Sequence, residues 1–295
     1  MHGGPSQPQI QFGFLRVLIL FLCVVTGSSC ASEEVDPPDA VEDDLANAVG
    51  EVMSSVDESL LTQFSADSIP SARACFSSLD PFGDCEVSAL GGALRTRDYA
   101  SCTVNQGSFD GTVTLSFSAS DCTLDSTGKS VSRIPSMTIE GRNGDRTLTV
   151  FVVSGSSGAT LTRGTSTESY SLGVDGLVRT ATRSGDLVLN QQIDTGSSLP
   201  VVGISRQGRT MNLGSLTVAD SLTGDRTELE PSQLVWDSSC TCPISGSWSG
   251  ETSHSTGATT YVIIEMTGCA QALVTRVSSG AFTETEVEMD RCDSL

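Results

Sequence analysis

The sequence predicts a mainly β protein: a large antiparallel meander, either a sandwich or a curved open sheet, with one amino-terminal amphipathic helix and several disulfides. Three observations carry this prediction. Serine and threonine together number 76 of the 295 residues, while aromatic residues make up only 5%. From residue 101 onward, apolar and polar residues alternate in one stretch after another. The chain also has ten cysteines. A sheet with one hydroxyl-rich face has this composition.

The first 29 residues have the layout of a signal peptide. A single basic residue, Arg16, precedes the apolar stretch VLILFLCVV (17–25), and small residues follow it. The stretch is too short to cross a bilayer as a helix, which takes about 20 apolar residues. We therefore expect an exported protein whose mature form has no transmembrane helix.

The end of this leader, VVTGSSC (24–30), resembles the lipobox of bacterial lipoprotein precursors, in which small residues precede a lipidated cysteine. Gly27 stands where that pattern usually has leucine or another aliphatic residue. The resemblance implies that Cys30 carries the lipid, palmitate included, and becomes the mature amino terminus. Since Ala31 rather than aspartate follows the cysteine, it also implies an outer-membrane lipoprotein. The alternative is ordinary secretion into the periplasm or the medium.

The remaining cysteines are expected to form disulfides. Cys23 leaves with the leader, and besides Cys30 eight remain, an even number that can pair completely. We expect Cys75 to pair with Cys85 or with a nearby strand. Cys240 and Cys242 could hold a metal through two thiolates, but we expect each to take a different disulfide partner. The eight candidates are Cys75, Cys85, Cys102, Cys122, Cys240, Cys242, Cys269 and Cys292.

Residues 30–100 are expected to form a tether, a helix and a cysteine-containing segment. Residues 30–44 are acidic, contain two prolines and bury little, which predicts a solvated tether. From about Asp39 to Phe64, apolar residues recur every three or four positions, which predicts an amphipathic helix. We expect this helix to cover one face of the protein's own sheet, the alternative being a docking helix for a partner. Residues 45–100 then comprise the helix and the compact cysteine segment.

Residues 101–295 are expected to form one antiparallel β domain of roughly 11–14 strands. In GTVTLSFS (111–118), Val113, Leu115 and Phe117 share one face, and hydroxyl residues share the other. Similar stretches follow up to FTETEVEM (282–289), separated by turn dipeptides such as Asn143-Gly144. No helix-sized apolar pattern occurs in this part of the sequence.

Few residues offer nucleophilic or acid–base chemistry. His254 is the one histidine after the leader, in a stretch that predicts a turn, and no Gly-x-Ser-x-Gly motif accompanies it. The motif Ser-x-x-Lys occurs at Ser126–Lys129, but the surrounding residues also predict a turn. We expect neither to be catalytic.

The last predicted strand places Glu284, Glu286 and Glu288 on one face, with neighbouring side chains about 7 Å apart. This separation is near that of an inverting glycosidase pair, although a solvated face near a sheet edge is the favoured interpretation. Three aromatic residues could stack on sugars but are expected in the core: Trp236, Trp248 and Tyr261.

Charge limits the class of partner. The chain has 36 acidic and 16 basic residues and a net charge of −20, so it repels nucleic acid. No cofactor or metal is expected. We expect a lipid-anchored envelope protein of binding or structural type, more plausibly not an enzyme, whose partner is an envelope protein, a glycan or a lipid. One version is a carrier that shields an apolar ligand. The alternative is an envelope hydrolase using Glu284 and Glu286.

Overall fold

A computed structural model describes residues 39–61, 83–89, 91–104, 107–141, 146–166 and 168–292. The leader, most of the tether, Cys30 and Cys75 lie outside the described residues. Residues Pro37–Leu295 form one compact unit, so the helix and the sheet belong together. The domain boundary expected at residue 100 therefore falls inside a strand of the sheet.

The described residues contain one α-helix and seventeen strands, which confirms a mainly β protein with an amino-terminal helix. The helix is α1 (Asp39–Leu61). The first strands are β1 (Glu86–Val87), β2 (Ala93–Val104), β3 (Gly107–Phe117), β4 (Ser130–Gly141), β5 (Arg146–Val152), β6 (Gly158–Arg163), β7 (Ser169–Asp175), β8 (Leu177–Arg183) and β9 (Asp186–Ser197). The others are β10 (Leu199–Val202), β11 (Thr210–Met211), β12 (Ser215–Asp220), β13 (Asp225–Val235), β14 (Ser245–Ser253), β15 (Thr259–Gly268), β16 (Gln271–Ser278) and β17 (Ala281–Glu288).

All strand pairs are antiparallel, but the order is not a simple meander because the sheet divides at β4. The first half of β4 pairs with β6, and its second half pairs with β5. One branch then runs through β8, β9 and β12, and the other through β7, β10 and β11. Both branches rejoin on β13, and β13 to β17 continue as consecutive hairpins. Fifteen strands, β3 to β17, begin after residue 100, so the expected count of roughly 11–14 was slightly too low; β10 and β11 are only four and two residues long.

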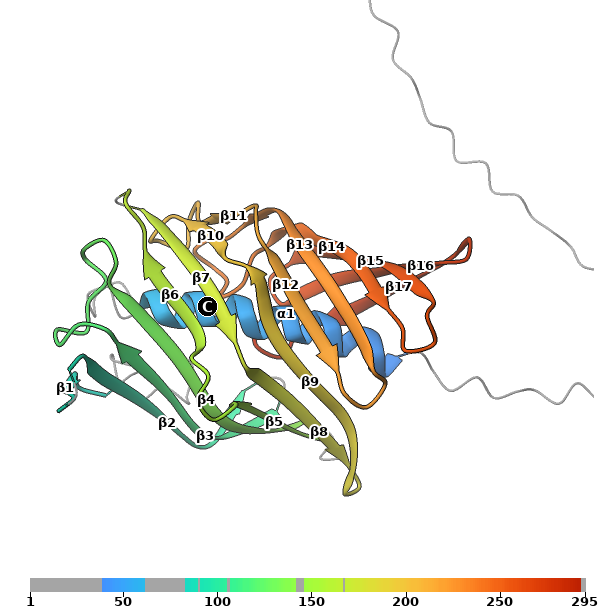
Figure 1. Ribbon diagram of the computed structural model, residues 1–295. Coiled ribbons are helices and arrows are strands. Elements are labelled where there is room, and N and C mark those ends of the chain that lie inside the picture. The colour runs from blue at the N-terminus through green and yellow to red at the C-terminus, as the bar shows by residue number, and fades with distance from the viewer. Residues whose placement is uncertain are drawn as a thin grey trace, which may run out of the picture. The chain divides into compact units, whose positions relative to one another are not determined.

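The sheet curves around α1, which crosses its inner side (Figure 1). Side chains of the helix are buried at every position from Asp44 to Leu60, not along one stripe only. Val49, Val52 and Val56 belong to the same core as the inward residues Val113, Leu115 and Phe117 of β3. Among the described residues, no helix is long and apolar enough to cross a membrane.

Gly50 of α1 lies where the helix packs against the segment that follows β17. A β-carbon there would lie 3.4 Å from the Cys292 sulfur and 3.5 Å from the Met289 β-carbon. Glycine costs about 1 kcal/mol in a helix interior compared with alanine. An alanine β-carbon would fit here at ordinary van der Waals contact with Cys292 and Met289.

Candidate functional site

The most unusual feature of the interior is a set of acidic side chains on α1. Asp44, Glu51 and Glu58 recur every seven residues and so lie along one side of the helix, with Asp57 beside them. All four are buried, although charged residues are rarely buried unless they are paired. Each faces arginines from the sheet or its loops.

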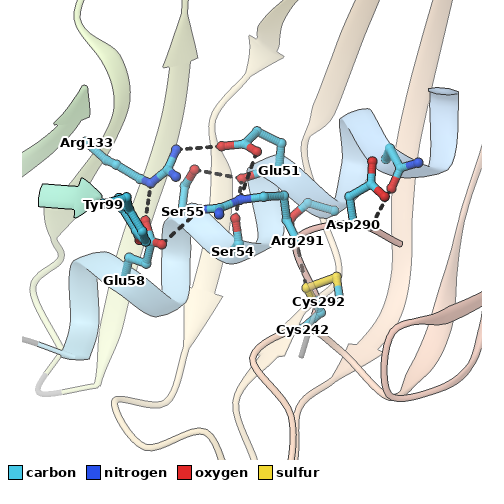
Figure 2. Close-up of polar contacts among 12 residues, drawn as sticks. Glu51, Ser54, Ser55, Glu58, Tyr99, Arg133, Cys242, Asp290, Arg291 and Cys292 are labelled. Carbon is cyan, nitrogen blue, oxygen red and sulfur yellow. Dashed lines mark hydrogen bonds and ion pairs between the residues drawn. A yellow bond between two sulfur atoms is a disulfide. The ribbon is translucent and has the colours of Figure 1, made fainter. Parts of the chain in front are cut away.

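Glu51 and Glu58 are held by a group of three arginines, which we call the arginine cage: Arg97 of β2, Arg133 of β4 and Arg291 after β17. Arg133 donates from Nη1 to Glu51 Oε1 at 2.7 Å and from Nε to Glu58 Oε2. Arg291 lies 3.1 Å from Glu51 through Nε and donates to Glu58 at 3.0 Å through Nη2. Figure 2 shows both arginines converging on the two glutamates of the helix. Arg133 thus fixes α1 to β4, and Arg291 fixes it to the segment that follows β17.

The other two acids of α1 have their own arginines. Arg206 donates through two nitrogens to the two oxygens of Asp57, each at 2.7 Å, and Arg209 approaches the same carboxylate at 3.1 Å. Arg146 of β5 pairs with Asp44, whose backbone carbonyl accepts from Arg179 of β8 at 2.8 Å. The helix is therefore tied along its whole buried length by side chains from distant parts of the sequence.

Burial and pairing act in opposite directions on the pKa values of these acids. Burial alone would raise the pKa of Glu58, but the positive charges of Arg133, Arg291 and Arg97 outweigh it and lower the pKa to about 2. The pKa of Glu51 is lowered for the same reason, chiefly by Arg291 and Arg133. Both groups are thus permanently charged near neutral pH and are not tuned for proton transfer.

The arginine cage is a structural feature and not a reaction centre. Arg133 is fully buried, Glu51 is 1% exposed, and their charges are satisfied by each other. A substrate would have to displace α1 to reach them. The sequence gives no signal for the cage, because its arginines are scattered over nearly 200 residues (97 to 291) and only the folded sheet brings them together.

Acid should destabilise the protein through Glu58. Its folded pKa of about 2 lies below the ordinary value of 4.5, so its contribution to stability is complete above pH 4.5 and is lost as the pH falls towards 2. Burial raises the pKa of Asp290, which works in the opposite direction and offsets part of this loss. We expect the free energy of unfolding, measured by urea denaturation, to fall steadily between pH 4.5 and 2.5. The variant Glu58→Gln should show a shallower fall; an equal slope in both proteins would contradict the assignment.

Disulfides confirm the expected use of the cysteines. The structure joins Cys240 to Cys269 and Cys242 to Cys292, so the adjacent pair does take separate partners. Cys85 is bonded to Cys122, so the expected pairing of Cys85 with Cys75 is wrong. The side chain of Cys102 lies outside the description. In the part of the chain that the structure describes, no group of three or more His, Cys, Asp or Glu side chains is placed to hold a metal.

The glutamates considered for hydrolysis do not form a cleft. Glu284, Glu286 and Glu288 are exposed on the outward face of β17. Their partners across the strand pair are Thr275, Leu273 and Gln271, none of which is an acid. The carboxylates therefore lie along a surface, without a second carboxylate facing them across a substrate.

His254 lies in the β14–β15 turn, as predicted, and connects two other groups. Its Nδ1 is 3.0 Å from Asp225 Oδ2, and its Nε2 is 2.8 Å from Thr260 Oγ1. This order of groups resembles that of a catalytic triad, but Thr260 is only 7% exposed, so its hydroxyl is closed to a substrate. The arrangement ties the β12–β13 and β14–β15 turns together.

The remaining candidates are explained by turns and by the core. Lys129 lies in a turn that its backbone amide closes on the Ser126 carbonyl, and its ammonium group binds Asp121 at 2.7 Å and Asp125 at 2.8 Å. Trp236 and Trp248 are buried, as expected, and cannot stack on a sugar. Tyr261 was expected in the core but is 42% exposed, because it points outward from β15.

A shallow hollow of about 370 Å³ opens on the outer face of the sheet, beside the β12–β13 turn. Its polar wall is formed by Asp225, which also binds His254, and by the neighbouring Arg226. The residues that matter for its chemistry are Val178, Asn190, Gln192, Asp220, Asp225 and Arg226. Val178 and Ala219 line the hollow together with polar side chains, a mixture common at ligand sites, and we take this hollow as the candidate functional site.

No family model matches the chain, and neither a curated protein nor a solved structure does.

Proposed function

We propose that the protein is exported, anchored to the outer membrane through a lipid on Cys30, and acts there as a binding or structural component of the cell envelope. The signal-peptide layout, the lipobox-like VVTGSSC and the acidic stretch behind it support the anchor and the tether. Three disulfides among the described residues support an oxidising, extracytoplasmic location.

The observation that supports binding at the outer surface is that α1 fills the inside of the sheet. Its side chains are buried from Asp44 to Leu60 and ion-paired to the sheet, which argues against a carrier that shields an apolar ligand there. Function then belongs to the outer surface, where the hollow beside Asp225 lies. The hydrolase alternative receives no support from the exposed, unopposed Glu284 and Glu286.

The anchor can be tested by expressing the full chain, with its own leader, in a bacterium with two membranes. We expect the mature protein in the outer-membrane fraction, with a mature amino terminus at Cys30 whose mass includes its acyl chains. Cys30→Ser should abolish both the added mass and the processing. Cys23→Ser is the matched control, because Cys23 lies in the leader, and it should change neither. An unmodified mature chain in the soluble periplasmic fraction would reject the proposal.

A further inference from the structure

Two straight rows of outward side chains cross the sheet and end at the hollow. Strands β3, β4, β5, β8 and β9 are neighbours in this order (Figure 1). The registers place the members of each row directly opposite one another. The first row is Asp110, Thr138, Thr149, Thr180 and Asn190. The second row is Thr112, Ser136, Phe151, Val178, Gln192 and, on β12, Ala219. We call these two rows the polar track.

The polar track offers hydrogen-bonding groups of both kinds. Hydroxyls donate and accept, and the amides of Asn190 and Gln192 do so at the end that enters the hollow. Gln192 donates from Nε2 to Asp194 at 2.8 Å, and this bond does not use its side-chain carbonyl oxygen, which is an acceptor. Within the described part of the chain, the side chain of Asn190 has no hydrogen-bonding partner. The Asn190 side chain can therefore serve a ligand without first breaking a contact of the fold.

Phe151 gives the track an aromatic surface. It points outward from β5 between Ser136 and Val178 and is partly exposed, whereas both tryptophans are buried. Phe151 has the Ser136 hydroxyl on one side and Val178 on the other, with the amides of β9 farther along the track; this set suits a sugar, whose C–H face packs on the ring while its hydroxyl groups bond to the polar groups. A purely apolar or a purely ionic ligand would use only part of this set.

Charge and length define the ligand further. The middle of the track carries no charge, and a protein with a net charge of −20 repels polyanions. Five strands at about 4.8 Å spacing give a track of about 19 Å, which is long enough for several sugar rings in line. We infer that the polar track binds an extended neutral polysaccharide, with the hollow taking one of its ends. This inference rests on the proposed binding function and names its ligand class.

Affinity electrophoresis tests the inference, because the strong negative charge carries the protein through a native gel. The mature protein, extracted in mild detergent, is run through gels containing hydroxyethylcellulose, laminarin, galactomannan or dextran, and through one containing the polyanion polygalacturonate. We expect at least one neutral polysaccharide to retard it and polygalacturonate not to. Phe151→Ala should weaken that binding at least tenfold.

Further variants keep this test decisive if Phe151→Ala fails to fold, which thermal unfolding would show. Thr149→Arg places a bulky cation in the middle of the track, and Asn190→Ala removes an amide at its end; both should weaken binding tenfold or more. Phe282→Ala is the matched control, because Phe282 is 67% exposed on β17, away from the track, and should bind as the wild type does.

The inference is overturned by any of three results: no neutral polysaccharide retards the protein, the folded track variants bind unchanged, or polygalacturonate retards it equally. The mass of the same preparation reports whether Cys30 is lipidated. A lipidated protein that binds no glycan rejects the polar track alone, whereas an unmodified protein that binds glycan rejects the anchor alone.

Discussion

Replacing Arg133 by methionine is expected to lower the free energy of unfolding by about 3–5 kcal/mol, because the substitution removes one of the two arginines that bind both buried carboxylates. Arg133 is fully buried and binds both Glu51 and Glu58. Methionine fills part of the same volume, so the loss of unfolding free energy mainly reports the removal of the guanidinium charge. Urea denaturation with the disulfides intact measures the change. A domain is typically stable by only about 5–15 kcal/mol, so the effect is large.

Two comparisons separate charge from packing in this experiment. Arg226→Met breaks the exposed pair with Glu228, where we expect a change of about 0–1 kcal/mol. Adding Glu51→Gln alone to Arg133→Met should recover part of the loss, because Arg291 and Arg97 then share the carboxylate of Glu58 and the arginine cage regains its wild-type net charge. A loss below about 1 kcal/mol for Arg133→Met alone would mean that α1 is not held by the arginine cage.

Removing the disulfide between Cys242 and Cys292 is the second large change. The bond closes a loop with a sequence separation of 50 residues, and in the chain-entropy model its loss costs about 4 kcal/mol. The Cys292 sulfur also lies against Gly50 of α1, and the adjacent Arg291 belongs to the arginine cage. The double variant Cys242→Ala, Cys292→Ala should therefore lose more than the loop entropy alone.

The disulfide between Cys85 and Cys122 provides the matched control. Its sequence separation is 37 residues, so the chain-entropy term is again about 4 kcal/mol. Neither of its cysteines, however, neighbours a residue that binds α1. We expect the Cys85→Ala, Cys122→Ala variant to unfold at higher urea concentration than the Cys242→Ala, Cys292→Ala variant. Equal midpoints would show that the carboxyl-terminal segment does not brace the helix.

The helix and most strands could be predicted because each has a local pattern. Val113, Leu115 and Phe117 alternate with hydroxyl residues, and the apolar positions of α1 recur every three or four residues. Strand β2 was missed because two of its inward positions are Arg97 and Tyr99, which interrupt the apolar alternation. Arg97 faces Glu58 of the helix and donates to the Tyr99 hydroxyl, so the pattern is broken where β2 contributes to the arginine cage.

The division of the sheet and the candidate site could not be predicted, because both depend on pairing between distant strands. Inward and outward residues alternate along β4 in the same way whether the strand pairs with one strand or, as here, with β6 along its first half and β5 along its second half. The sequence predicts only that each of three residues points outward from its own strand: Thr149, Thr180 and Asn190. Only the observed registers align them in one row that ends at the hollow.

Binding at the outer face requires α1 to be a permanent part of the interior, so that ligands meet only the outer face. Native-state hydrogen exchange followed by NMR or mass spectrometry measures this directly. The backbone amides between Val49 and Val56 should exchange as slowly as the most protected strand amides, with an opening free energy equal to that of global unfolding. If these amides exchange at a much lower free energy while the sheet stays protected, the helix opens independently, and the interior rather than the outer face is available to a ligand.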